Sequence, residues 1–412
     1  MGKGTGAGAL NTAPLSLKAI ATMKPEELPT KKQLKDAIPA HCFKYSIPTS
    51  LGLVLRDAIV IGAIGWAGWN YLPQETNWTT PEGIAGKLAW NAYWFLQGTA
   101  FTGWWVLAHE CGHGGFSASS TLNDCVGWVL HSFLLVPYFS WQYSHAKHHA
   151  KTNHLLDGES HVPPGKSYYK IFNKFHGLIG EDAFAVYELV THLLLGWPMY
   201  LFFNATGARR TPQGEPMTTI HDHFRPWSKL FPSHRKWDLR VYMSTFGCLL
   251  TLYGLYEAGN VLGHGRVNWT YWPSYLWCNF WLVLYTWLQH TAPNLPHFGE
   301  DEWTWVRGGL CTIDRPYGVF DWMHHHIGST HVAHHLFSYL PCYHAVEATA
   351  ALKAYLEPRG LYHYDPTPWP QAAWQVAHQC HYVESVKGVQ HYKSITDTSA
   401  QRKAERKAKK AE

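Results

Sequence analysis

Three histidine clusters are the residues of this chain that are best suited to chemistry. They are HECGH at residues 109–113, HAKHH at 145–149 and HVAHH at 331–335. Residues three or four apart lie on one face of a helix, so each cluster can direct its imidazoles at one point. Chance would place ~0.13 HxxHH patterns in a chain with 28 histidines among 412 residues, and two occur. The clusters therefore predict metal ligands.

These clusters supply eight candidate ligands, which are His109, His113, His145, His148, His149, His331, His334 and His335. A structural zinc ion binds four ligands and a catalytic one only three from the protein, so this number of imidazoles predicts two metal ions. Imidazole binds zinc, copper, iron and nickel, and the ligand type alone does not name the metal. The eight cysteines are scattered without a CxxC pair, which argues against a zinc ribbon or a disulfide framework.

The surroundings of the clusters limit which reaction a metal bound there could carry out. Each cluster follows an apolar segment, and no nucleophile or acid–base pair accompanies it. Such a setting favours oxygen activation on a lipid. Removing hydrogen from an unactivated methylene is beyond side-chain acid–base chemistry and is within the reach of iron.

Two other classes of protein compete with this interpretation. HECGH also matches the HExxH pattern of zinc proteases, and Leu156-Asp157-Gly158 imitates the second motif of intramembrane proteases. In intramembrane proteases the second motif normally lies on a separate, distant membrane helix, whereas here it follows the first histidine cluster closely and lies in a polar loop. A protease would also give no role to the two HxxHH clusters. A metal transporter would place its histidines inside membrane spans, whereas these clusters lie outside the apolar segments.

Segregated apolar stretches predict the elements that position the clusters. About 20 helical residues cross a bilayer core, and we expect four such spans at residues 58–72 with its flanks, 88–108, 239–262 and 271–289. Two weaker stretches, 126–138 and 186–203, are expected to lie in the interface or to cover the site, although the second could span. The predicted fold is an all-α integral membrane protein with a cytosolic helical cap that carries the histidine clusters.

Charge predicts the organisation and the topology. We expect a polar cytosolic N-terminal segment at 1–45, a membrane domain at 46–384 and a charged cytosolic tail at 385–412, without a cleaved signal peptide. Lysine and arginine gather before the first span and in the long middle loop, which places both termini in the cytosol. The ending Lys409-Lys410-Ala411-Glu412 resembles a dilysine retrieval signal of the endoplasmic reticulum, and a solvated charged helix is the alternative interpretation.

The text around the clusters resembles the membrane fatty acid desaturases, from IPAHCF at residues 38–43 to about Val383. The sequence is similar to the Δ12 branch of this family in eight stretches, which are WVLAHECGH, VGWVLHS, LLVPY, SHAKHH, LQHT, DRPYG, THVAHHLFSYLP and YHAVEAT. In the Δ12 branch the first histidine box is HECGH, whereas ω3 enzymes typically have HDCGH or HDAGH at that place. The resemblance implies a cytosolic di-iron site with the eight histidines as ligands, dioxygen as co-substrate, and electrons from cytochrome b5 and NADH-cytochrome b5 reductase. It also implies a ninth ligand, for which His290 in LQHT is the candidate and His297 the competitor. His324, His325 and His326 are expected to be outer-sphere or solvated.

The resemblance further implies an enzyme of the endoplasmic reticulum that inserts a cis double bond at Δ12 of oleoyl chains, on phosphatidylcholine, to give linoleoyl chains. An ω3/Δ15 desaturase, a hydroxylase, an epoxygenase and a conjugase are the alternatives. Gly114 and Gly115 stand where many relatives have histidine, and a bulkier side chain there is expected to press on the acyl tunnel. No HPGG motif of a fused cytochrome b5 domain occurs, so a separate electron donor is expected. No nucleic-acid partner is expected.

Overall fold

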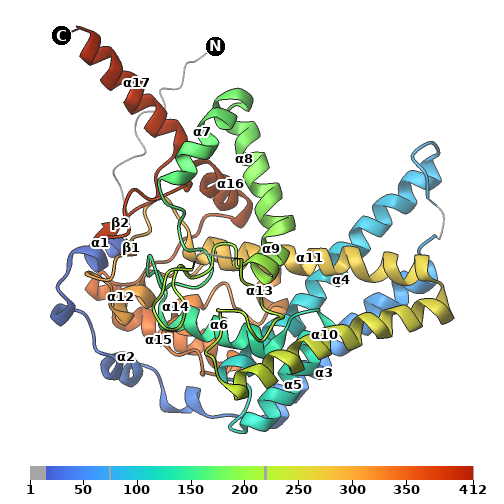
Figure 1. The fold of residues 1–412 in the computed structure, drawn as a ribbon. Coiled ribbons are helices and arrows are strands. Elements are labelled where there is room, and N and C mark those ends of the chain that lie inside the picture. The colour runs from blue at the N-terminus through green and yellow to red at the C-terminus, as the bar shows by residue number, and fades with distance from the viewer. Residues whose placement is uncertain (1–14, 74–75, 218–219, 412) are drawn as a thin grey trace.

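The structure is a computed structural model that describes residues 15–73, 76–217 and 220–411. Helices form nearly all of its regular structure (Figure 1). The described strands are two short ones, β1 (His297–Phe298) and β2 (Val389–Gln390), which pair antiparallel with His297 opposite Gln390. The predicted all-α class is therefore confirmed.

Four long helices coincide with the four predicted spans. They are α3 (Ile47–Tyr71), α4 (Pro81–His113), α10 (Arg235–Leu262) and α11 (His264–His290). α4 packs against α3 and α11, and α10 packs against α11. The side chains of Ser46 and Thr80 cap α3 and α4 by accepting hydrogen bonds from backbone N–H groups of the first turn. Figure 1 shows the four helices running together away from the rest of the molecule.

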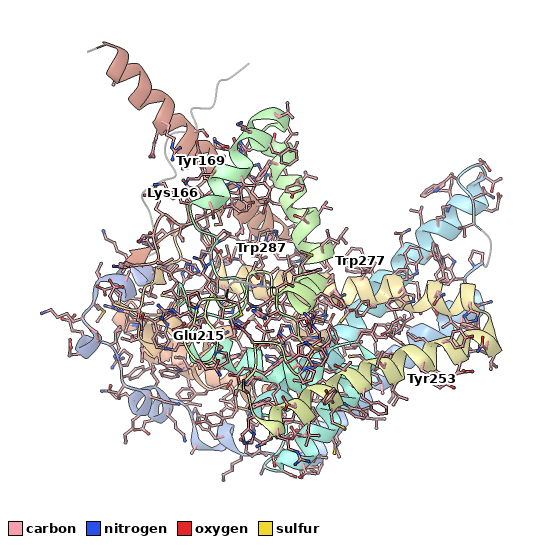
Figure 2. The ribbon with its side chains drawn as sticks, viewed as in Figure 1. Lys166, Tyr169, Glu215, Tyr253, Trp277 and Trp287 are labelled. Carbon is pink, nitrogen blue, oxygen red and sulfur yellow. The ribbon has the colours of Figure 1, made fainter. Side chains whose placement is uncertain are left out.

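The outer faces of these helices are apolar. Leu55 and Ile59 on α3 are each 62% exposed, and Phe246 and Tyr253 on α10 are 55% and 61% exposed; Figure 2 labels Tyr253. By length and composition, two described helical segments could cross a membrane, namely α3 and residues 181–203. α4, α10 and α11 do not meet this test of length and composition. α4 and α11 contain polar residues, such as Gln97 and Asn279, that are buried in the protein.

Residues 181–203 form one helical rod with a wide turn in its middle. The rod comprises α8 (Glu181–Val190), the π-helical turn η3 (Thr191–Leu195) and α9 (Gly196–Phe203), and α7 (Ser167–Ile179) precedes it. η3 and α9 contact α11, and by length and composition residues 181–203 could also span, which is the alternative left open for the second weak stretch. The first weak stretch, 126–138, is not one helix. α5 (Ser120–Phe133) ends before Leu135, which has a φ of 54°, and α6 (Tyr138–Ala150) begins after Pro137.

A cap of short helices completes the fold. It contains α12 (Trp305–Leu310), α13 (Val319–Met323), α14 (His331–Leu336), η4 (Cys342–His344), α15 (Ala345–Leu356), η5 (Glu357–Arg359) and α16 (Trp369–Gln379). The N-terminal segment forms α1 (Leu15–Thr22), η1 (Pro25–Glu27), α2 (Lys31–Ala37) and η2 (Ala40–Phe43). Leu17 and Leu34 are buried in the same core as Leu336 and Leu352, so this segment is part of the cap.

The C-terminal segment is also folded at its start. Ile395 is fully buried at the beginning of α17 (Ile395–Ala411), and α17 contacts α7. The side chains of Lys409 and Lys410 lie outside the described structure, as do residues 1–14 of the predicted segment 1–45. The three segment boundaries remain predictions.

Candidate metal centre

The histidine clusters lie at helix ends that meet beneath the cap. His109 and His113 occupy the last turn of α4, and His290 is the last residue of α11. The second and third clusters belong to α6 and α14. α6 contacts α4, and rings from α4, α6, α11 and α14 lie against one another in the interior.

The structure brings all nine predicted ligands together as two groups. The first histidine group is His109, His113, His145, His149 and His334, whose ligand nitrogens all lie within 4.8 Å of one another. The second histidine group is His148, His290 and His335 by the same criterion, joined by His331, whose Nε2 lies 3.0 Å from that of His290. The rings of His149 and His335 stack at 4.1 Å and connect the groups.

The inner nitrogens have the spacing of metal ligands. Four Nε2 pairs lie 3.0–3.2 Å apart: His109 with His113, His145 with His149, His148 with His290, and His290 with His331. Two ligands bound at about 2.1 Å and at right angles are ~3 Å apart. The buried Nε2 atoms of His334 and His335 have no hydrogen-bond partner among the described residues. Two metal ions therefore fit the donors that are present.

Four of the outer nitrogens are held by neighbouring acceptors, whereas Nδ1 of His149 and Nδ1 of His290 have no hydrogen-bond partner among the described residues. Nδ1 of His109 lies 3.1 Å from the Glu110 carboxylate, and Nδ1 of His331 lies 3.2 Å from the Ile327 carbonyl. Nδ1 of His148 contacts the Glu159 carbonyl. Nδ1 of His335 lies 3.0 Å from the hydroxyl of Thr152, which itself donates to the His148 carbonyl. An Nδ1–H bonded outward leaves the Nε2 lone pair facing inward, which is the arrangement of metal-bound histidines.

Burial keeps the imidazoles of α6 and α14 neutral. Burial away from water disfavours the charged imidazolium, and it lowers the pKa of His148 to about 4 and that of His331 to about 3. Burial, and then the neighbouring imidazoles, lower the pKa of His145, His149, His334 and His335 well below the ordinary value. The neutral form is the one that binds a metal.

Asp314 fixes the start of α14, and the sequence pattern did not identify it. Its buried carboxylate accepts hydrogen bonds from the Val332 backbone N–H at 2.8 Å and from the Tyr362 hydroxyl at 2.6 Å. A carboxylate at a helix N-terminus also interacts favourably with the helix dipole. Asp314 lies in the DRPYG stretch, where no spacing or periodicity points to a role.

The other candidate histidines lie elsewhere. His297 is buried on β1 and belongs to neither group. His324 bridges the Tyr285 hydroxyl at 2.8 Å and the Thr99 carbonyl at 3.0 Å, and His325 lies 2.8 Å from the carboxylate of Asp57 on α3. Both are buried, so neither is solvated, and they tie the loop before α14 to the long helices.

An apolar cavity of about 460 Å³ reaches both histidine groups. His145 of the first group and His148 of the second group line it, and Trp197, Met199 and Val283 form part of its apolar wall. Its polar groups include a hydrogen bond of 2.9 Å between His161 Nε2 and the Thr286 hydroxyl. The volume is that of a small-molecule site.

Because Gly114 and Gly115 do not line this cavity, an acyl chain bound there would not meet a side chain at either position. Gly114 has a φ of 74° and ends α4 in the left-handed conformation. A Cβ added at Gly115 would instead lie 3.1 Å from the Glu110 carboxylate.

The geometry disfavours a zinc protease. Glu110 contacts the outer nitrogen of His109, away from the inner face where a general base would meet a metal-bound water. Asp157 lies in neither histidine group and contacts Arg210 and His154.

Comparisons with known proteins give one consistent result. The family model for fatty acid desaturases matches residues 88–367. The chain is 40% identical over 388 residues to a Δ12 fatty-acid desaturase of Arabidopsis thaliana, which covers 92% of this chain and 95% of the relative. It is 42% identical over 355 residues to an omega-6 fatty acid desaturase of the endoplasmic reticulum from Brassica juncea, and the match covers 86% of this chain and 88% of the relative. It is also 38% identical over 359 residues to an oleoyl-12-hydroxylase of Ricinus communis, and this match covers 87% of this chain and 88% of the relative.

Proposed function

This chain belongs to the fatty acid desaturases, which are oxidoreductases, and on that premise we propose that it inserts a cis double bond at Δ12 of oleoyl chains to give linoleoyl chains. The observation that carries the proposal is the apolar cavity that reaches His145 and His148, one histidine from each group. An acyl chain in this cavity lies beside both groups.

We propose that the first and second histidine groups each bind one iron ion. Bound iron supplies the activation of dioxygen that removes hydrogen from an unactivated methylene. In the overall reaction, two neighbouring methylenes each lose one hydrogen atom, and dioxygen is reduced to two water molecules. Two electrons and two protons complete the balance, with the electrons coming from cytochrome b5 and NADH-cytochrome b5 reductase.

The histidines act by presenting neutral Nε2 atoms inward. Their outer partners, such as Glu110, Thr152 and the Glu159 carbonyl, orient the rings and fix the proton on Nδ1. His290 is the ninth ligand in this proposal, because its Nε2 lies 3.1 Å from that of His148 and His297 lies in neither group.

The cavity residues exclude water and position the acyl chain. Trp197, Met199 and Val283 bury apolar surface, which favours a hydrocarbon over water. The His161–Thr286 pair is the polar contact that an ester group of phosphatidylcholine could use. A displacement of ~1 Å of the reacting carbon can cost about a hundredfold in rate, so the wall of the cavity selects the reacting methylene.

We further propose that the protein crosses the membrane of the endoplasmic reticulum four times, with both termini in the cytosol. Support comes from the apolar outer faces of α3 and α10, from the basic residues outside the spans, and from relatives named as enzymes of that membrane. Residues 181–203 lie in the interface over α11 in this arrangement.

Hydroxylation is the second candidate function. The relative named as an oleoyl-12-hydroxylase is 38% identical to this chain, close to the 40–42% of the named desaturases. A hydroxylase would attack the same region of the oleoyl chain, so the same cavity serves either outcome.

Expression in a yeast that makes oleate but no polyunsaturated fatty acids tests the proposal. Mass spectrometry should locate a new double bond at Δ12, and a His148→Ala variant with the same expression level should give none. A hydroxylated product would favour the second candidate, and a Δ15 bond formed only on supplied linoleate would contradict the Δ12 assignment.

A further inference from the structure

Four metal-binding side chains converge at a second place, on the outer edge of the cap. They are His41 and Cys42 of η2, His344 of η4 and Glu347 of α15, and their ligand atoms all lie within 4.8 Å of one another. More than 300 positions of sequence separate His41 from Glu347. We propose that these four side chains bind a single divalent transition-metal ion of the zinc class, separate from the two histidine groups.

The distances suit such an ion. His41 Nε2 lies 2.9 Å from both carboxylate oxygens of Glu347 and 3.7 Å from Cys42 Sγ. Tetrahedral ligands bound at about 2.0–2.3 Å are ~3.3–3.8 Å apart. The rings of His41 and His344 meet edge to face at 5.7 Å. Shifts of a few tenths of an ångström in exposed side chains therefore close the site.

The donor set distinguishes this place from an ordinary surface ion pair. A His–Glu pair requires neither a thiol nor a second imidazole, and a half-exposed pair contributes little stability. Two nitrogens, one sulfur and one oxygen make up a four-coordinate zinc site that is closed, as structural zinc sites are. His41 and Glu347 are 53% and 51% exposed, so an ion can enter from solvent.

The thiol is the buried donor of the site. Cys42 is fully buried, and its Sγ lies 3.7 Å from His41 Nε2. Metal binding would release the thiol proton and convert the thiol to the thiolate ligand.

The site would fasten the N-terminal segment to the element behind the third histidine cluster. η2 and α2 contact α15, and α15 contacts α14; Figure 1 shows α2 and α15 near one another at the edge of the cap. We therefore assign the ion a structural role, with a contribution to the thermal stability of the cap.

X-ray absorption at the zinc edge tests the proposal, because the two histidine groups contain no sulfur ligand. Full-length, iron-loaded protein in detergent is supplied with one equivalent of zinc, and both metals are quantified. We expect about one zinc per chain without loss of iron, and a sulfur neighbour at about 2.3 Å. The variant Cys42→Ala should lose the sulfur signal, whereas Cys125→Ala, which removes an exposed thiol on α5, should retain it.

Glu347→Gln provides a second test if Cys42→Ala fails to fold, because Glu347 lies half-exposed on the surface. This variant should bind zinc more weakly, and in its zinc-free state it should melt at the temperature of the iron-loaded, zinc-free wild type. Zinc with only nitrogen and oxygen neighbours, zinc that enters only by displacing iron, or zinc binding unchanged in Glu347→Gln would each overturn the proposal.

Discussion

Replacing Asp314 by alanine should weaken the metal centre although Asp314 is not a ligand. The carboxylate accepts hydrogen bonds from the Val332 N–H and the Tyr362 hydroxyl, and all three groups lie in the cap around α14. Alanine would leave both donors without their acceptor. Each unpaired buried donor costs about 1–3 kcal/mol, so the variant should lose about 2–6 kcal/mol in the stability of this region.

The loss should reach the iron because α14 carries His331, His334 and His335. We expect Asp314→Ala to lower both the melting temperature and the iron content per chain. Tyr362→Phe removes one of the two hydrogen bonds and should have a smaller effect, of about 1–3 kcal/mol. Tyr364→Phe is the matched control, since Tyr364 is 43% exposed and makes no hydrogen bond to Asp314 through its side chain.

Metal analysis and differential scanning fluorimetry of purified protein measure both quantities. We expect Tyr364→Phe to have the iron content and melting temperature of the wild type, Tyr362→Phe to have lower values, and Asp314→Ala to have the lowest. An Asp314→Ala protein with wild-type iron content and melting temperature would refute the role assigned to the carboxylate.

Four further predictions concern the ligands, the cavity, the end of α4 and the topology. His148→Ala should abolish activity and reduce iron per chain while circular dichroism stays unchanged, because it removes an Nε2 that lies 3.1 Å from His290; unchanged iron would contradict this. Gly196→Leu should shift the chain-length preference or reduce turnover in an acyl-chain assay, since Gly196 lines the cavity and a Cβ there already lies 3.2 Å from Val283. Gly114→Ala should leave the product ratio unchanged and cost about 1–2 kcal/mol, because Gly114 has a φ of 74° outside the cavity. In sealed microsomes a C-terminal epitope should be open to protease, and Lys409→Ala with Lys410→Ala should weaken retention in the endoplasmic reticulum; a protected epitope would contradict the topology.

The long helices and the histidine clusters could be predicted because both have local signals. A run of apolar residues fixes a helix such as α3 without knowledge of its neighbours. Spacing of three and four places His145, His148 and His149 on one helix. The choice between His290 and His297 had no such signal, because His290 ends the last long helix, His297 follows seven residues later, and the path of the loop decides which one reaches the other histidines.

Contacts between distant segments could not be predicted from the pattern. Asp314, Thr152 and Glu159 support the histidines through hydrogen bonds that depend on how the cap folds. The predicted contact of Gly114 with the acyl chain depended on the path of the chain after α4, and Gly114 does not line the cavity that we propose for the acyl chain. The N-terminal segment was predicted to be polar and cytosolic, and no local signal showed that its short helices bury Leu17 and Leu34 in the cap.

Reconstitution of the purified protein tests the central claim most directly. The iron-loaded protein is supplied with oleoyl-phosphatidylcholine, dioxygen, NADH, cytochrome b5 and its reductase, and the product lipid is analysed by mass spectrometry. We predict linoleoyl-phosphatidylcholine with a cis double bond at Δ12, and no product when iron is removed. A hydroxylated lipid, a double bond at another position, or full activity of the iron-free protein would contradict it.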